Sequence, residues 1–266
     1  MEKQQIIEAA RLLGEAERTR CQTGLISLLH PEATMDDAYA IQAEWMTQKI
    51  AAGRKVFGWK IGLTSKAMQQ QLNIATPDSG VLLDDMVFET GGVIPAGRFI
   101  QPRVEAEIAF VMKRGIKGPN ITPADVLAAT DFVTPSIEIL DTRIKRIDPA
   151  TGKSRNIIDT ISDNAANGGI VLGREKFDPR KVDLRWVGAI VMRNGEVEET
   201  GLGAGVLNDP ALGIAWLANR LAQYGDEILA GQVVLSGSFV RAIEAPTACQ
   251  IEADFGSFGK VTCGFA

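Results

Sequence analysis

The sequence is poor in the residue types on which several common catalytic sites depend. Its 266 residues include one histidine and three cysteines. The histidine, His30, precedes a proline between two expected helices, so no second imidazole is available for a Ser-His-Asp or Cys-His site. The cysteines (Cys21, Cys249 and Cys263) are far apart and indicate neither a disulfide framework nor a zinc site. These shortages direct attention to carboxylates and lysine.

The sequence also lacks long apolar runs and an excess of positive charge. A formal net charge of −5 disfavours nucleic acid and anionic membranes as partners. No apolar run approaches the roughly 20 residues that cross a bilayer. The first residues, Met-Glu-Lys-Gln-Gln, contain no signal-peptide core. Together with the few cysteines, this pattern leads us to expect a cytoplasmic protein in a reducing compartment.

The hydrophobic pattern changes near residue 55. Before it the chain reads as helical, with a capping box at Thr34–Asp37 and an apolar stripe that includes Ile41 and Trp45. After it we expect more strands than helices, without regular alternation. This favours an α+β fold with a helical N-terminal part, residues 1–55, and a mainly-β core of mixed sheets, residues 56–266, in one compact unit.

The expected elements of the core can be placed by residue range. We expect strands near 56–63, 81–88, 103–112, 232–238, 248–255 and 259–265, and a hairpin that turns at Asn194-Gly195. We expect helices after Ser65, after Thr122 and over 209–224. A loop from about 142 to 168 is long enough to indicate a functional role.

Three glutamates on two short apolar strands form the most informative pattern. Glu105 and Glu107 point to one side of their strand, because successive strand side chains alternate. Glu138 stands alone in a second apolar run. Burying such acids is costly unless something pairs with them, and a hard divalent cation prefers oxygen ligands. The alternative for Glu105 and Glu107 alone is the solvated face of an antiparallel strand, but the addition of Glu138 favours a metal site.

Lys60 and Asp78 are candidates for proton transfer. Lys60 shares its strand face with Gly58 and Gly62, which leave space on both sides of the lysine. Over such a cleared apolar surface, desolvation would lower the pKa of Lys60; the alternative is a lysine that extends its stem along a strand edge. Asp78 could orient a water or a substrate group, although Pro-Asp-x-Gly is also a good turn sequence, and the pattern alone favours the turn.

Two polar segments could line a pocket. Ser162-Asp-Asn-Ala-Ala-Asn-Gly168 is dense in hydrogen-bonding residues, and Ser236-Gly-Ser238 ends an apolar strand where hydroxyl and amide donors could bind a carboxylate. Either segment could equally be an ordinary loop or strand end. We take Ser162, Asp163 and Ser236 as candidate substrate-binding residues.

Six segments of the chain resemble one family in the same order and spacing. They are Gly58-Trp-Lys-Ile-Gly-Leu-Thr-Ser65, Glu105-Ala-Glu107, Ile137-Glu-Ile-Leu-Asp141, Ser162-Asp-Asn-Ala-Ala-Asn167, Gly201-Leu-Gly-Ala-Gly-Val-Leu207 and Ala215-Trp-Leu-Ala-Asn219. The family is the 2-oxopent-4-enoate hydratase and 4-oxalocrotonate decarboxylase group, within the fumarylacetoacetate hydrolase superfamily. The similarity covers nearly the whole chain. Phe99-Ile-Gln-Pro-Arg103 and Arg155-Asn-Ile-Ile-Asp-Thr160 favour a subgroup that acts on a seven-carbon dicarboxylic acid in aromatic catabolism.

The resemblance implies a β-roll core that binds Mg²⁺ or Mn²⁺ through three acids, which match Glu105, Glu107 and Glu138. It places a lysine beside the metal, which matches Lys60. It further implies a homo-oligomer that hydrates a small 2-oxo-alkenoate, with the upstream decarboxylase as a further candidate partner. Two departures, Ser79 in place of a common aromatic and Asp209 in place of a frequent histidine, put the substrate fit in doubt more than the chemistry.

Several alternatives remain open at this stage. A seven-carbon dicarboxylic substrate calls for a cation far from the metal, and Arg103 and Arg155 are the candidates. A 2-oxopent-4-enoate hydratase or a 4-oxalocrotonate-type decarboxylase would use the same metal site, so the sequence separates these activities poorly. Outside enzymes, the chain could be a non-catalytic subunit of a hydratase–decarboxylase complex, which the retained acids and Lys60 disfavour.

Overall fold

The N-terminal part of the chain is helical, as expected. The computed structural model describes residues 1–65, 69 and 76–266. The described helices are α1 (Lys3–Thr19), α2 (Ile26–Leu29), α3 (Met35–Ala51), α5 (Pro123–Ala129), α6 (Ile157–Ser162) and α7 (Pro210–Gln223). The predicted capping box is confirmed at α3, where the Asp37 N–H donates to Thr34 and the Thr34 N–H donates to the Asp37 carboxylate. The helix expected after Ser65 lies outside the described residues.

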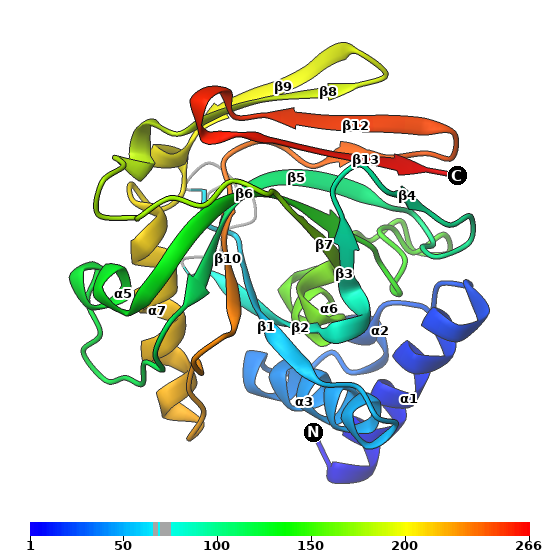
Figure 1. Ribbon diagram of the computed structural model, residues 1–266. Coiled ribbons are helices and arrows are strands. Elements are labelled where there is room, and N and C mark those ends of the chain that lie inside the picture. Colours follow the sequence, from blue (N-terminus) through cyan, green and yellow to red (C-terminus); the bar gives the residue numbers. More distant parts are fainter. Residues whose placement is uncertain (66–68, 70–75) are drawn as a thin grey trace.

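A strongly curved sheet of eight strands forms the centre of the molecule (Figure 1). Its strands follow the order β2-β1-β10-β5-β6-β7-β3, and β11 pairs with β5. They are β1 (Val56–Gly62), β2 (Asp78–Leu83), β3 (Val87–Glu89), β5 (Arg103–Met112), β6 (Thr130–Leu140), β7 (Asn167–Leu172), β10 (Val233–Ser238) and β11 (Ile243–Glu244). The sheet is mixed, because β1–β10 and β3–β7 are parallel whereas the other pairs are antiparallel.

A second sheet of five strands covers the curved sheet on one side (Figure 1). It has the order β4-β13-β12-β8-β9. Its strands are β4 (Val93–Ile94), β8 (Gly188–Arg193), β9 (Glu196–Leu202), β12 (Cys249–Asp254) and β13 (Lys260–Phe265). The predicted β8–β9 hairpin is confirmed: Asn194 and Gly195 both have positive φ, the conformation that a two-residue hairpin turn requires. With its helices and mixed sheets, the chain has the predicted α+β fold.

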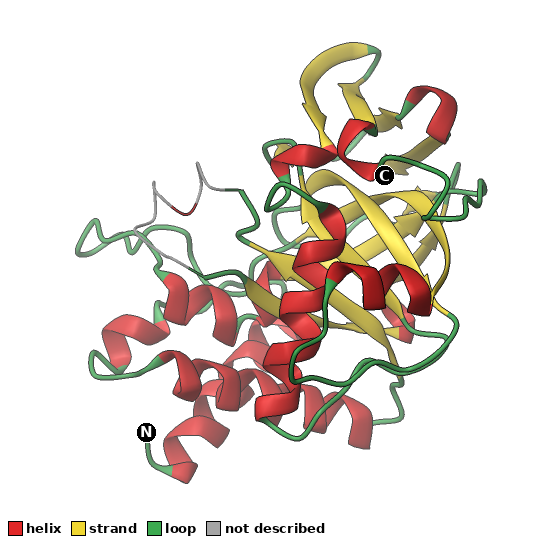
Figure 2. Cartoon of the chain, turned by 90° about the vertical axis from the view of Figure 1, so that its left-hand side faces the viewer, coloured by secondary structure: helices red, strands yellow, loops and turns green. Residues whose placement is uncertain are grey.

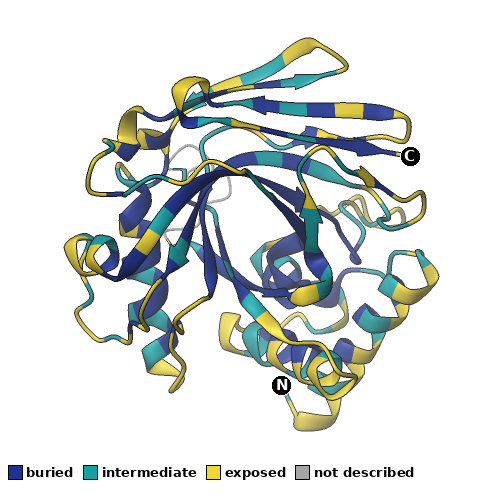
Figure 3. Cartoon of the chain, in the orientation of Figure 1, coloured by how far each residue is buried: buried dark blue, intermediate teal, exposed yellow. Residues whose placement is uncertain are grey.

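The main hydrophobic core lies on the outer side of the curved sheet. There the side chains of Val104, Ala106 and Ile108 of β5 join a cluster with residues of α5, α7 and the second sheet. A separate cluster holds α1 and α3 against β2, and Trp45 of α3 is buried in it. The helices surround the sheet with buried inward faces and exposed outer faces (Figures 2 and 3). The opposite side of the curved sheet, which we call the inner face, therefore carries the remaining side chains of β5.

Two local expectations differ from the structure. The strand expected near 81–88 is interrupted, because β2 ends at Leu83, a 3-10 turn spans Asp84–Met86 and β3 begins at Val87. The loop predicted over about 142–168 contains α6, and β7 already begins at Asn167. Six residues are too few to give a helical period, although Asn156 caps this helix with Asp159 in a capping box.

None of the described helices is long and apolar enough to cross a bilayer. The division of the chain at residue 55 into two parts stays a prediction.

Candidate metal centre

The three predicted glutamates meet on the inner face of the curved sheet. Glu105 lies directly opposite Glu138 in the β5–β6 ladder, and Glu107 follows on the same face. One carboxylate oxygen from each residue lies within 4.8 Å of the others. Glu107 and Glu138 are fully buried, and Glu105 is partly buried. The alternation predicted from the sequence therefore brings all three acids together.

The oxygens of this triad are poorly satisfied by the protein. Glu107 Oε2 accepts a hydrogen bond from the Gly237 N–H at 2.8 Å, and Glu138 Oε1 forms an ion pair with Lys60 Nζ at 3.1 Å. Apart from this contact with Lys60, Glu107 Oε1 and the two oxygens of Glu138 have no hydrogen-bond partner within the described part of the chain. Burial and the neighbouring carboxylates raise the pKa of Glu107 well above its ordinary value, and the same causes raise the pKa of Glu105 to about 7.

This arrangement fits a hard divalent cation. Three convergent carboxylates are the donor set that Mg²⁺ or Mn²⁺ prefers, and two of them, Glu107 and Glu138, carry buried oxygens without a hydrogen-bond donor of their own. Without a cation, the crowded acids hold protons, as their raised pKa values indicate. A bound cation would replace those protons. Glu105, Glu107 and Glu138 are therefore the residues that could hold a metal ion.

A backbone irregularity in β10 places the Gly237 amide at Glu107. The β10–β5 register shifts between Leu235 and Ser238, and Gly237 has a φ of 106°. A Cβ on Gly237 would lie 2.3 Å from Thr64 Oγ1, so both the conformation and the space require glycine. The sequence Ser-Gly-Ser suggested donors here, but the specific amide could not be foreseen.

Lys60 lies beside the triad, but its predicted electrostatics were wrong. Its ammonium group contacts Glu138 and donates to the Ala165 carbonyl at 3.1 Å. Burial alone lowers the pKa of Lys60, but Glu138, Asp78, Glu105 and Glu107 together raise the pKa above its ordinary value. The prediction treated the surroundings as apolar, whereas four carboxylates surround the lysine. Lys60 is therefore a cation in the metal-free protein.

Asp78 opens a buried strand and is not part of an exposed turn. It lies opposite Gly62 in the β1–β2 ladder, and burial raises the pKa of its carboxyl group. A Cβ on Gly62 would lie 2.2 Å from Asp78 Oδ1 and 3.3 Å from Lys60 Nζ. The missing side chain of Gly62 thus makes room for Asp78 beside Lys60. By contrast, Gly58 is required by the backbone of β10, since its Cβ would lie 1.8 Å from the Val233 carbonyl oxygen.

A left-handed turn presents the carbonyl group that binds Lys60. Asn164, Ala165 and Ala166 all have φ between 52° and 58°, which is rare and unfavourable for residues other than glycine. Asn164 stabilises the turn through two bonds to Val81, accepting from its N–H at 2.7 Å and donating to its carbonyl oxygen at 2.9 Å. This contribution of the Ser162–Asn167 segment was not predicted; the high frequency of asparagine in left-handed backbone was the available signal.

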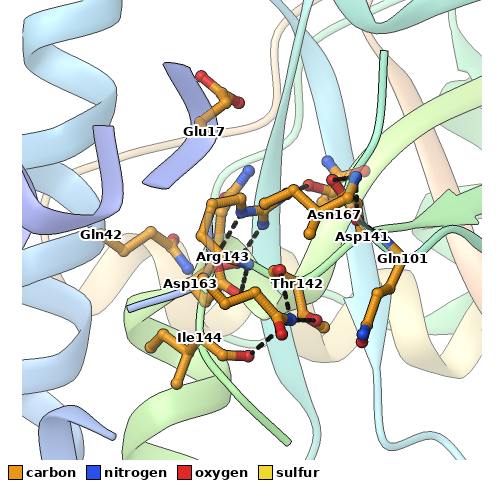
Figure 4. A network of polar contacts seen from close by, with 12 residues as sticks. Glu17, Gln42, Gln101, Asp141, Thr142, Arg143, Ile144, Asp163 and Asn167 are labelled. Carbon is orange, nitrogen blue, oxygen red and sulfur yellow. Dashed lines mark hydrogen bonds and ion pairs between the residues drawn. The ribbon is translucent and has the colours of Figure 1, made fainter. Parts of the chain in front are cut away.

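A buried ion pair anchors the same turn (Figure 4). Arg143 donates from Nε to Asp163 Oδ1 at 2.5 Å and from its backbone N–H to Asp163 Oδ2 at 2.9 Å. Its terminal nitrogens donate to the carbonyl oxygens of Asn167 and Asp163. Because Arg143 occupies both carboxylate oxygens of Asp163, the structure favours a positioning role for Asp163, and its direct contact with substrate stays a prediction.

The remaining candidates, which the structure describes, form no hydrogen bond with the three acids. Ser162 and Ser236 are fully buried, and their hydroxyl groups have no partner among the residues described. Arg103 shares the inner face of β5 with Glu105, and Arg155 is close enough to Asp78 to favour its charged form. Each of these residues thus has a polar atom or charge that the described part of the protein leaves unpaired, and their roles stay predictions.

Known proteins resemble this chain over almost its full length. No protein-family model matches the sequence. A 2-oxo-hept-4-ene-1,7-dioate hydratase of Escherichia coli is 52% identical over 96% of both chains. A 2-hydroxyhexa-2,4-dienoate hydratase of Comamonas testosteroni is 40% identical over 92% of this chain and 91% of the relative. The structure of a 4-oxalocrotonate decarboxylase from Pseudomonas putida G7, complexed with magnesium and adipate, has a TM-score of 0.94 at 34% identity and covers 100% of this chain and 99% of its own.

These similarities agree with the geometry of the acid cluster. The solved relative contains magnesium, and the present chain brings three carboxylates together in a form suited to such an ion. The identities of 52% and 40% extend over both the helical part and the sheets, which is sufficient to assign the family. This chain belongs to the family of 2-keto-4-pentenoate hydratases and 4-oxalocrotonate decarboxylases.

Proposed function

We propose that this chain is a metal-dependent hydratase that adds water to 2-oxohept-4-ene-1,7-dioate and yields 4-hydroxy-2-oxoheptane-1,7-dioate, in the catabolism of aromatic compounds. The observation that carries the proposal is the convergence of Glu105, Glu107 and Glu138 beside Lys60, with buried oxygens of Glu107 and Glu138 that lack a hydrogen-bond partner among the described residues. The 52% identity to a hydratase of that name supports the substrate. The enzyme is accordingly a lyase.

Glu105, Glu107 and Glu138 would hold Mg²⁺ or Mn²⁺. When bound, the cation would polarise the 2-oxo group of the substrate and so favour loss of a proton from C3. The inner face below the triad is apolar, since Leu82, Ala109 and Leu235 form a buried cluster there. This surface would exclude bulk water and strengthen the electrostatic interactions at the site.

Lys60 and Asp78 are proposed as the proton-transfer groups. Asp78 would take the proton from C3, because burial raises the pKa of its carboxyl group and makes it a better base. Lys60, which is a cation here, would give a proton to C5 and bring the remaining double bond into conjugation with the ketone. The proton held by Asp78 would then pass to the neighbouring Lys60 and restore both groups. Water then adds at C4, and its second proton goes to C3. The Ala165 carbonyl and Glu138 would hold the Lys60 ammonium group in place during these steps.

The test is the mass of the product formed from 2-oxohept-4-ene-1,7-dioate in the presence of Mg²⁺ and, separately, of EDTA. A gain of one water that depends on Mg²⁺ supports the hydratase. Loss of CO₂ from a 4-oxalocrotonate-type acid, with no water added to the first substrate, would instead establish the decarboxylase. No metal binding and no turnover of any of these acids would favour a non-catalytic partner subunit.

Three broader features belong to the same proposal. They are a β-roll as the finer description of the core, a homo-oligomeric assembly and a cytoplasmic location. Similarity to a solved relative over the full length supports the shared core fold. Light scattering of the purified protein would measure its oligomeric state directly.

A further inference from the structure

Three arginines near the acid cluster contain guanidinium nitrogens that are buried without an acceptor. Within the described residues, Arg103 Nε, Arg146 Nε and Arg155 Nη1 have no hydrogen-bond partner. An unsatisfied buried donor is costly, most of all in a charged group. Three such donors in neighbouring side chains are available to an anion.

Two of these arginines face each other at the base of one loop. Ile147 and Ser154 form an antiparallel bridge, and the Arg155 N–H donates to the Arg146 carbonyl oxygen at 2.9 Å. Arg146 and Arg155 are therefore cross-strand neighbours. Like charges placed in this way destabilise a strand pair. Glu244 accepts from Arg146 at 2.7 Å, but that pair is partly exposed and therefore weak, so it offsets little of the repulsion.

Arg103 connects this pair to the acid triad. It lies on the same face of β5 as Glu105, and Glu244 lies opposite it on β11. Burial and then Arg146 lower the pKa of Arg103, whereas Glu105 and Glu244 raise it, so all three groups are close to Arg103. Arg146 and Glu244 also line a cavity of about 500 Å³. Arg103 thus lies close both to Glu105 of the triad and to Arg146, which lines the cavity.

We propose that Arg103, Arg146 and Arg155 together form an anion site that binds the distal carboxylate of a dicarboxylic substrate. The proposal rests on the proposed function, which places the other end of the substrate at the triad. Guanidinium groups bind carboxylates through two parallel hydrogen bonds, which suits unpartnered donors. Arg146, which the sequence did not single out, is part of the site.

Arg103 and Glu105 are two residues apart on one face of β5, about 7 Å along its axis. A dicarboxylic acid with one end at the triad would extend its other carboxylate toward the arginines. A shorter monocarboxylic acid would leave the arginines unpaired.

The binding experiment uses two six-carbon probes that differ by one carboxylate. Calorimetric titration of the Mg²⁺-loaded protein with adipate and with hexanoate gives the preference for the diacid. We expect Arg103→Gln, Arg146→Gln and Arg155→Gln each to weaken adipate binding roughly 10- to 100-fold and to change hexanoate binding less than about 2-fold. The matched control is Arg180→Gln, whose side chain is exposed and paired with Asp178.

Thermal unfolding distinguishes this site from a structural role. The three arginines repel one another, but each also lies near a carboxylate: Glu244, Asp163 or Glu105. Removing one charge should therefore change the melting temperature of the metal-free protein by less than about 2 °C. A larger fall, together with equal weakening of both acids, would overturn the proposal, as would a wild type with no preference for adipate.

Turnover separates this proposal from the proposed function. The three variants should lose kcat/KM for 2-oxohept-4-ene-1,7-dioate while retaining that for 2-oxopent-4-enoate. If the wild type hydrates neither acid, the proposed function fails, and the adipate–hexanoate comparison still decides the anion site. If the variants lose both substrates equally, the anion site is wrong and the hydratase assignment stands.

Discussion

Replacing Glu107 with glutamine should have opposite effects on the protein with and without metal. The triad brings its oxygens within 4.8 Å, where two full charges repel by about 3.5 kcal/mol at an effective dielectric constant of 20. Protons already relieve part of this repulsion, as the raised pKa of Glu107 indicates. The glutamine oxygen can still accept from the Gly237 N–H. We therefore expect the metal-free Glu107→Gln protein to gain roughly 1 kcal/mol, or about 2–4 °C in melting temperature.

Mg²⁺ should stabilise this variant against unfolding much less than it stabilises the wild type. A wild type at a hundredfold excess over its dissociation constant gains about 2.7 kcal/mol from the ion, and the variant should gain far less and lose turnover. Thermal and urea unfolding in EDTA and in Mg²⁺ measure both effects. The matched control is Asp163→Asn, which leaves the buried Arg143 unpaired and should cost about 3–5 kcal/mol in either condition. A Glu107→Gln protein that is less stable in EDTA, or that keeps the full Mg²⁺ effect, would refute the reasoning.

Three further outcomes follow from the site. The pKa of Glu105 is raised from 4.5 to about 7, so between these pH values the folded metal-free protein binds more protons than the unfolded chain. Its stability should therefore fall as the pH rises from 4.5 to about 7. Over the same range the affinity for Mg²⁺, measured by calorimetry, should rise, because the ion binds the deprotonated acid. An affinity that is flat between pH 6 and pH 8 would contradict this. Gly62→Ala would force its Cβ against Asp78 Oδ1, 2.2 Å away, so kcat should fall at least about 10-fold, and normal kcat would remove Asp78 from the site. Asn164→Ala should cost about 1–3 kcal/mol in urea unfolding, because two bonds to Val81 are lost; an unchanged midpoint would show that the turn needs no such anchor.

The sequence was sufficient for those parts of the site that depend on strand alternation. Glu105 and Glu107 are two residues apart, so the period of a strand fixed their common face. The position of Glu138 beside Glu105 depends on the pairing of β5 with β6. The only sequence signal for it was that Glu138 stands alone in an apolar run. The hairpin at Asn194-Gly195 and the capping box at Thr34 were predictable for a similar reason, since each depends on residues that are close in the chain.

The rest of the site depends on contacts between distant segments. The pKa of Lys60 was predicted with the wrong sign, because Glu138 and Asp78 reach it from other strands. Asp78 was placed in a turn because its proline and glycine neighbours are common in turns, yet pairing with β1 makes it the first residue of a buried strand. The carbonyl of Ala165 could not be predicted, since alanine has no preference for left-handed backbone.

The central claim is that Glu105, Glu107 and Glu138 bind one divalent cation. Anomalous diffraction from crystals of the wild-type protein grown with Mn²⁺ tests it most directly. We predict a single strong peak between these three carboxylates and its loss in crystals of a Glu138→Gln variant. A peak at any other position, with none at the triad, would contradict the assignment.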